Sequence, residues 1–288
     1  MSAKSALIIG CGYLGVRLAR ILLSKKMAVT ATTRTDENWP ILERLGVQAM
    51  LFDLGSEDHF PTQFCESGVD EFDVFFMVPT SATTRAFQSG AFARLAAGIQ
   101  SVPLRRAFLI SSTGIYARIN EQVVDASSTV FGAEQRSTRI RLIEEQWLDM
   151  GKNFFVSRLA GLYGPNRIIG RSKLLSGESI PGDPQAWLNL IHVEDAARFL
   201  DESNESAHTR RIELASDARP IRRCDYYNFV ANELGAPSVA EFDIDNPRAS
   251  GSYRCDPAST MARIGWTPRY ANFGDGIIDS LAAERADS

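Results

Sequence analysis

Short apolar runs alternate with longer amphipathic stretches through the first half of the chain. The runs are rich in Val, Ile, Phe and Leu and are apolar at nearly every position, which is typical of parallel strands covered on both faces. They predict strands at Ala6–Ile9, Ala28–Thr32, Ala49–Phe52, Val74–Val78, Ala107–Ile110 and Phe154–Arg158. The stretches between them predict helices at Leu14–Met27, Phe87–Gln100 and Ser137–Met150. This alternation predicts an α/β fold, a Rossmann-type doubly wound parallel sheet.

The regular alternation ends near Tyr163. Gly and Pro residues between Gly164 and Pro184 predict a loop with a short helix, and the C-terminal tail is again punctuated by Pro. The elements predicted in between are a strand turning into a helix over Trp187–Leu200, with Asp195 capping that helix, a strand at Arg211–Ala215 and a helix near Asp225–Leu234. We expect a first domain over residues 1–164 and a smaller lobe over 165–288, in which 187–215 returns to the sheet.

A glycine-rich turn follows the first predicted strand directly and opens a helix. Its sequence, Gly10-Cys11-Gly12-Tyr13-Leu14-Gly15, has the GxGxxG spacing. The first glycine allows a tight turn, the second lets a diphosphate approach the backbone, and the third lets helix and strand pack closely. The helix N-terminus adds free N–H groups and partial positive charge. The turn therefore predicts a dinucleotide site in the first domain.

The end of the second predicted strand bears on which dinucleotide binds. An NAD site usually places an acid there to hold the ribose 2′-hydroxyl, whereas this chain has Arg34, which can pair with a 2′-phosphate. NADP is therefore favoured over NAD. Asp36 is the rival, because a shift of one or two residues would bring this acid to the ribose. Asp53, which ends the third predicted strand, is well placed to accept a hydrogen bond from the adenine amino group.

Composition and charge narrow the function classes. The 288 residues are 44% hydrophobic, with a formal net charge of −4, which excludes a disordered chain and gives no general attraction to nucleic acid or anionic membrane. No apolar run approaches the roughly 20 residues that span a bilayer. The Cys and His residues have no metal-ligand spacing, and no CxxC pair occurs. We expect a cytoplasmic protein with a small-molecule substrate, no metal, and no nucleic-acid or membrane partner.

Several blocks of the chain, taken in order, resemble the short-chain dehydrogenase/reductase superfamily, in its extended and atypical branch of NAD(P)-dependent epimerase/dehydratase-like proteins. The matching blocks cover roughly residues 5–200 and are Gly10–Gly15, Phe52–Leu54, Ile110–Tyr116, Arg158–Pro165 and Asn189–Asp195. The resemblance implies an NAD(P)-binding domain with a small C-terminal substrate lobe, and it raises a homodimer as the candidate assembly. The cofactor contacts expected from the turn and the resemblance are Gly10, Gly12, Tyr13, Leu14, Gly15, Arg34, Asp53, Leu54 and Val78.

The resemblance also implies a catalytic Ser, Tyr and Lys, of which only the serine matches. Ser112 stands at the serine position, while Ser137 takes the place of the tyrosine and Arg141 that of the lysine. A serine hydroxyl is a far weaker acid than a phenol, whose ordinary pKa is about 10, and an arginine relays protons poorly. The chain has no Tyr or Lys between Ala117 and Met150 to restore the pair.

Three alternatives remain for the chemistry. In the first, Tyr116 supplies the phenol beside Ser112 and Arg141, unless its side chain serves only in packing. In the second, Tyr163 or His192 is the acid. In the third, the protein binds NADP without turnover, as a sensor or scaffold. The leading hypothesis is an NAD(P)-dependent oxidoreductase or epimerase/dehydratase-like enzyme that acts on a hydroxyl- or carbonyl-bearing small molecule such as a sugar derivative.

Overall fold

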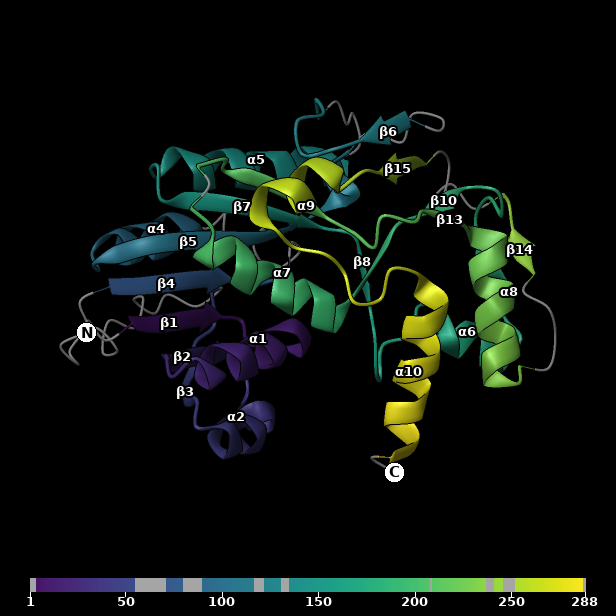
Figure 1. Ribbon diagram of the computed structural model, residues 1–288, viewed down its shortest axis with the longest axis horizontal. Coiled ribbons are helices and arrows are strands. Elements are labelled where there is room, and N and C mark those ends of the chain that lie inside the picture. Colours follow the sequence, from purple (N-terminus) through teal and green to yellow (C-terminus); the bar gives the residue numbers. More distant parts are fainter. Residues whose placement is uncertain are drawn as a thin grey trace. The chain divides into compact units, whose positions relative to one another are not determined.

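A parallel sheet of seven strands organises the chain in the computed structural model, which describes residues 4–54, 71–79, 90–116, 122–130, 135–207, 209–236, 241–245 and 252–286 (Figure 1). The strand order is β12-β7-β5-β4-β1-β2-β3, and β1 pairs in parallel with both β2 and β4. The strands are β1 (Lys4–Ile9), β2 (Ala28–Thr33), β3 (Gln48–Leu51), β4 (Glu71–Phe76), β5 (Leu104–Ser112), β7 (Phe154–Leu159) and β12 (Ile212–Ala215). The predicted doubly wound α/β sheet is confirmed, and its strand order reverses between β1 and β4.

An apolar core joins the central strands to two helices, α4 (Ala91–Gln100) and α5 (Gln135–Asp149). The ring centroid of Phe76 in β4 lies 5.8 Å from that of Phe92 in α4 and 5.6 Å from that of Trp147 in α5. The Trp147 indole donates a 3.0 Å hydrogen bond to the Phe155 carbonyl, so this large side chain is buried without leaving a polar atom unsatisfied. The remaining helices of this part of the fold are α1 (Tyr13–Ser24), α2 (Trp39–Leu45) and α7 (Val193–Glu205).

The described residues fall into two compact units, each built from three stretches of chain. The first unit takes its residues from Met1–Ser111, Thr138–Arg158 and Ala197–Glu213, and the second from Ser112–Ser137, Leu159–Ala196 and Leu214–Ser288. The division at 164/165 that the sequence suggests stays a prediction.

The second unit holds four short strand pairs and several helices. The pairs are β6 (Gln122–Val124) with β15 (Tyr253–Cys255), β8 (Gly161–Tyr163) with β11 (Leu190–His192), β9 (Ile180–Pro181) with β14 (Phe242–Asp243), and β10 (Trp187–Leu188) with β13 (Ile221–Arg222). The helices are α6 (Arg171–Ser176), α8 (Arg223–Leu234), α9 (Ala258–Ile264) and α10 (Phe273–Ala286). Its core packs Tyr163, Leu190, Tyr226 and Ile277 together.

Most predicted elements are present, with ends shifted by a few residues. Because β4 ends at Phe76, Val78 lies beyond the strand rather than at its end. The first residues of the helix predicted at Phe87–Gln100 lie outside the described residues, and α4 is described from Ala91. The segment Trp187–Leu200 does turn from strand to helix, at Val193.

Two features of the second half were not specified by the sequence pattern. Asp195 lies in the first turn of α7, near the helix start as predicted, and it accepts backbone hydrogen bonds from Arg269 (2.7 Å) and Tyr270 (2.9 Å), so it also fixes a distant loop; its capping of the helix stays a prediction. The Pro-punctuated tail contains α9 and the fourteen-residue α10. Gly274 and Gly276 lower the helix propensity of α10, so the sequence pattern does not predict this helix.

Gly276 has a packing reason for being glycine. An added Cβ there would lie 2.2 Å from the Tyr163 hydroxyl oxygen, closer than any real Cβ contact. The helix can therefore pack against this ring only without a side chain at position 276.

Candidate functional site

The glycine turn lies at the point where the strand order reverses. Gly10 has a φ of +83°, a left-handed conformation that glycine adopts without steric cost. Its N–H donates to the Thr32 hydroxyl at 3.1 Å, and the Cys11 N–H donates to the Thr32 carbonyl at 2.8 Å. A Cβ at Gly10 would also approach Val78 to 3.1 Å. The turn is thus held between β2 and the segment after β4, where open α/β sheets bind their ligands.

The other two glycines of the motif have different surroundings. A Cβ on Gly15 would lie 3.0 Å from the Cys11 sulfur and 3.2 Å from the Ile8 side chain, so the glycine allows α1 to pack closely on β1. Around Gly12, in contrast, an added Cβ would meet nothing within 4 Å. Glycine at position 12 is therefore not required by the packing of the described residues, and its missing side chain leaves room for a group outside the chain.

Helix α1 begins at Tyr13, immediately after Gly12. Among the described residues no side chain caps its N-terminus, and its first turn has no acidic residue. The first N–H groups of a helix have no intrahelical partners and carry partial positive charge. Arg17 donates to the Tyr13 carbonyl at 2.7 Å and lies 4.2 Å from the Tyr13 ring centroid, which fixes the ring beside the turn. The turn and helix together can accept a phosphate.

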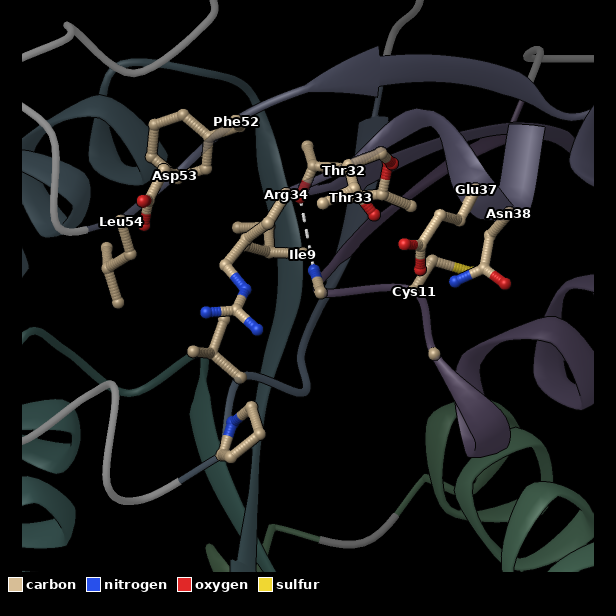
Figure 2. A pocket seen from close by; sticks show the side chains of 15 residues that line it. Ile9, Cys11, Thr32, Thr33, Arg34, Glu37, Asn38, Phe52, Asp53 and Leu54 are labelled. Carbon is tan, nitrogen blue, oxygen red and sulfur yellow. Dashed lines mark hydrogen bonds between the residues drawn. The ribbon is translucent and has the colours of Figure 1, made fainter.

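A cavity of about 530 Å³ opens beside the turn, entirely within the first unit (Figure 2). Of the expected cofactor contacts, six line it, namely Gly10, Gly12, Arg34, Asp53, Leu54 and Val78, whereas Tyr13, Leu14 and Gly15 do not. The lining residues that the sequence analysis did not single out are Ile9, Cys11, Thr32, Thr33, Thr35, Glu37, Asn38, Phe52 and Pro79. Asp36, the expected rival of Arg34, is not among them.

The cavity carries charges of both signs. Figure 2 shows Asp53 and Leu54 on one side in this view and Glu37 and Asn38 on the other, with Arg34 drawn between them. Burial raises the pKa of Cys11 to about 12, so its thiol stays neutral and unreactive at the base of the turn. Arginine, carboxylates and backbone N–H groups are the donors and acceptors that a nucleotide needs.

The first two catalytic candidates lie where β5 ends, in the second unit: Ser112 is the last residue of the strand, and Tyr116 follows the short 3₁₀ turn after it. The Ser112 hydroxyl accepts a 3.1 Å hydrogen bond from the Gly114 N–H. The Tyr116 side chain is only 2% exposed, and its hydroxyl donates to the Asp125 carbonyl at 2.7 Å. Its ring meets that of Tyr253 edge-on at 5.8 Å. This geometry fits the alternative in which Tyr116 serves in packing.

The other two candidates lie on α5. Ser137 is buried, near the beginning of the helix. Arg141 forms a 2.8 Å ion pair with Glu145 one turn on, with both side chains partly exposed. This pair is of the kind that stabilises helix surfaces weakly.

Tyr163 and His192, the remaining acid candidates, are both buried in the second unit with ring centroids 5.2 Å apart. Burial, reinforced by the nearby carboxylates of Asp217 and Asp195, raises the pKa of Tyr163 well above its usual value. His192 Nδ1 accepts a 3.3 Å hydrogen bond from the Glu194 N–H, and its Nε2 lies 3.2 Å from the Ser280 hydroxyl. Since an accepting Nδ1 must be unprotonated, the proton of the neutral ring is assigned to Nε2.

A buried ion pair that the sequence pattern did not reveal ties three elements of the first unit together. Arg158 in β7 donates to Glu144 in α5 at 2.7 Å, and Ser111 in β5 donates to the same carboxylate at 2.5 Å.

Among the described residues, no group of three or more His, Cys, Asp or Glu is arranged to hold a metal ion. Nor does any helix in these ranges combine the length and apolar character needed to cross a membrane.

No family model matches the chain. Protein YeeZ of Escherichia coli K12 is 27% identical over 244 residues, which cover 81% of this chain and 84% of YeeZ.

Solved structures with the same fold include the UDP-glucose 4-epimerase of Thermotoga maritima with UDP-glucose (TM-score 0.81, 13% identity, 98% of this chain and 99% of that one). The UDP-glucuronic acid 4-epimerase of Bacillus cereus in complex with NAD is similar to a comparable degree (TM-score 0.77, 13% identity, 98% and 99%). These likenesses confirm the resemblance to the extended short-chain dehydrogenase/reductases at the level of fold.

Proposed function

We propose that this protein binds a nicotinamide dinucleotide in the cavity beside the glycine turn and acts as an NAD(P)-dependent enzyme of the epimerase/dehydratase kind. The observation that carries the proposal is the open space at Gly12. This glycine is not needed for packing among the residues that the structure describes, faces a cavity of about 530 Å³, and directly precedes the N-terminus of α1. A diphosphate would take up that space and the N–H groups of the turn.

The residues around the cavity fit the remaining parts of the cofactor. Asp53 and Leu54 would hold the adenine, and Arg34 would meet a 2′-phosphate, for which we propose a preference for NADP over NAD. When bound, the dinucleotide supplies reversible hydride exchange at its nicotinamide ring.

For the substrate, we propose a small molecule with a hydroxyl or carbonyl group. Sugar nucleotides are the first class of substrate to test. Support comes from solved structures of the same fold, which include epimerases of UDP-glucose and UDP-glucuronic acid. Ser112 is the last residue of β5 and would hydrogen-bond the reacting oxygen, since its hydroxyl retains a proton to donate while accepting from Gly114.

A second candidate function is NADP binding without turnover. It is favoured by the state of the acid candidates, because the Tyr116 hydroxyl is bonded to a backbone carbonyl and Tyr163 and His192 are packed in the core. A protein of this kind would bind the dinucleotide and show no hydride exchange with UDP-glucose or UDP-glucuronic acid.

Gly12→Val tests the proposal directly. The backbone at Gly12 combines a φ of −107° with a ψ of −143°, outside the usual extended region, so a valine there carries some backbone strain although its side chain meets no described neighbour within 4 Å. We therefore expect the melting temperature to fall by no more than about 5 °C, while affinity for NADP and NAD, measured by calorimetric titration, falls at least about tenfold. A wild-type protein that binds neither dinucleotide would contradict the proposal, as would a variant that binds them unchanged.

A further inference from the structure

The cavity holds a carboxylate that the NADP argument does not use. Glu37 lines the cavity, whereas its neighbour Asp36 does not. Both belong to the 3₁₀ turn Asp36–Asn38 that follows β2. Successive side chains of a 3₁₀ helix point about 120° apart, and in this turn the two residues that line the cavity are Glu37 and Asn38, not Asp36. The turn therefore selects Glu37 as the acid that a bound nucleotide would encounter.

The charges that line the cavity give the Glu37 carboxylate an influence on which dinucleotide binds. Among the fifteen described residues that line the cavity, Arg34 is the one basic side chain, and Glu37 and Asp53 are the acidic ones. A nucleotide 2′-phosphate carries nearly two negative charges at neutral pH, as phosphate monoesters do. Glu37 would repel that phosphate and weaken the attraction of Arg34, whereas the hydroxyl of NAD could donate to the carboxylate.

We propose that Glu37 is a specificity-determining residue that limits the preference of this site for NADP over NAD. The proposal rests on dinucleotide binding in this cavity. Both effects of the carboxylate act in the same direction, since it disfavours a 2′-phosphate and favours a 2′-hydroxyl. Arg34 and Glu37 are both exposed, so salt should screen the repulsion.

The test compares Glu37→Gln with Asp36→Asn, which removes the same charge one residue away from a side chain outside the cavity lining. Dissociation constants for NADP and NAD are measured by calorimetric titration at about 0.02 M and 0.3 M salt. At low salt we expect Glu37→Gln to raise the ratio of the NAD to the NADP dissociation constant about fivefold to tenfold, and Asp36→Asn to change it less than about twofold. The effect of Glu37→Gln should shrink at high salt.

The outcomes separate this inference from the proposed function. The wild type could bind a dinucleotide while Glu37→Gln leaves the ratio of the two dissociation constants unchanged, or changes it no more than Asp36→Asn does. In that case the proposed role of Glu37 is wrong and the proposal of dinucleotide binding stands. If the wild type binds neither dinucleotide, both proposals fail together. Both positions are exposed, and equal melting temperatures of the variants would show that the substitutions leave the fold intact.

Discussion

The guanidinium of Arg158 and the carboxylate of Glu144 form a buried ion pair, with Arg158 3% and Glu144 2% exposed. Two nitrogens of Arg158 donate to this carboxylate, at 2.7 Å and 3.1 Å to the same oxygen. Because a buried charge without its partner is costly, the pair fixes α5 on the ends of β5 and β7. The position of α5 matters because the helix carries Ser137 and Arg141.

Removing one partner of this pair should destabilise the protein strongly. We expect Glu144→Ala to lower the free energy of unfolding by about 3–5 kcal/mol, because Arg158 would stay buried and unpaired. The measurement is equilibrium unfolding in urea. Glu145→Ala is the matched control, since it breaks the exposed Arg141 pair on the same helix and should cost less than about 1 kcal/mol. Equal losses in the two variants would contradict the role of the buried pair.

The contact between Gly276 and Tyr163 gives a second prediction. Gly276→Ala should destabilise the protein by about 1–3 kcal/mol, because the new Cβ must displace the Tyr163 ring or α10. Adding Tyr163→Phe should recover part of this loss, since it removes the hydroxyl that the Cβ meets first. Tyr163→Phe alone should not destabilise, because this buried hydroxyl has no hydrogen-bond partner among the described residues. A double-mutant cycle in urea that shows strict additivity would rule out the contact as the cause.

Asp217 should make stability depend on pH. Burial is the largest influence on this carboxyl and raises its pKa to about 7, although the Arg219 N–H bonds to it and opposes the rise. Because the pKa in the folded state exceeds the ordinary value of about 3.9, the contribution of Asp217 to stability is present below that value and is lost as the pH rises to 7.

Between pH 5 and pH 8 we expect the wild type to lose about 2–3 kcal/mol of unfolding free energy that Asp217→Asn does not lose. Unfolding in urea at the two pH values measures the difference. Asp36→Asn, at an exposed position, serves as the control and should follow the wild type. A variant at Asp217 that loses as much stability as the wild type would show that the group titrates normally.

The preference for NADP depends on Arg34. Arg34→Ala should weaken NADP binding about tenfold relative to NAD, because the charge-assisted contact with the 2′-phosphate is lost. Calorimetric titration with both dinucleotides measures the ratio. Arg44→Ala is the control, since its guanidinium donates to the Pro40 carbonyl on the exposed face of α2 and it does not line the cavity. If the ratio for Arg34→Ala equals that of the control, the 2′-phosphate argument is wrong.

The parts of the fold that could be predicted from sequence are those in which local pattern and final environment agree. The apolar run at Ala6–Ile9 and the glycine spacing after it specify the strand, the turn and the beginning of α1 without reference to the rest of the chain. Helix α10 could not be predicted, since Gly276 is chosen by contact with Tyr163, more than a hundred residues earlier in the chain.

The site was predictable to a similar extent. Arg34 and Asp53 come just after the ends of the neighbouring strands β2 and β3, so their place at the cavity followed from the parallel sheet. The choice of Glu37 over Asp36 depends on the 3₁₀ turn after β2, which the residue pattern does not specify. The ion pair of Glu144 and Arg158 required knowledge of which helix packs on which strands.

The edge strand β12 has a consequence for how the chain folds while it is being synthesised. It is formed by residues 212–215 and lies beside β7, where the Val156 N–H donates to the Arg211 carbonyl at 2.7 Å. A nascent chain that has left the ribosome only as far as β7 therefore presents an open row of backbone donors and acceptors. Until β12 pairs with it, this edge of β7 is open to pairing with strands of other chains, and a chaperone that covers it would prevent such pairing.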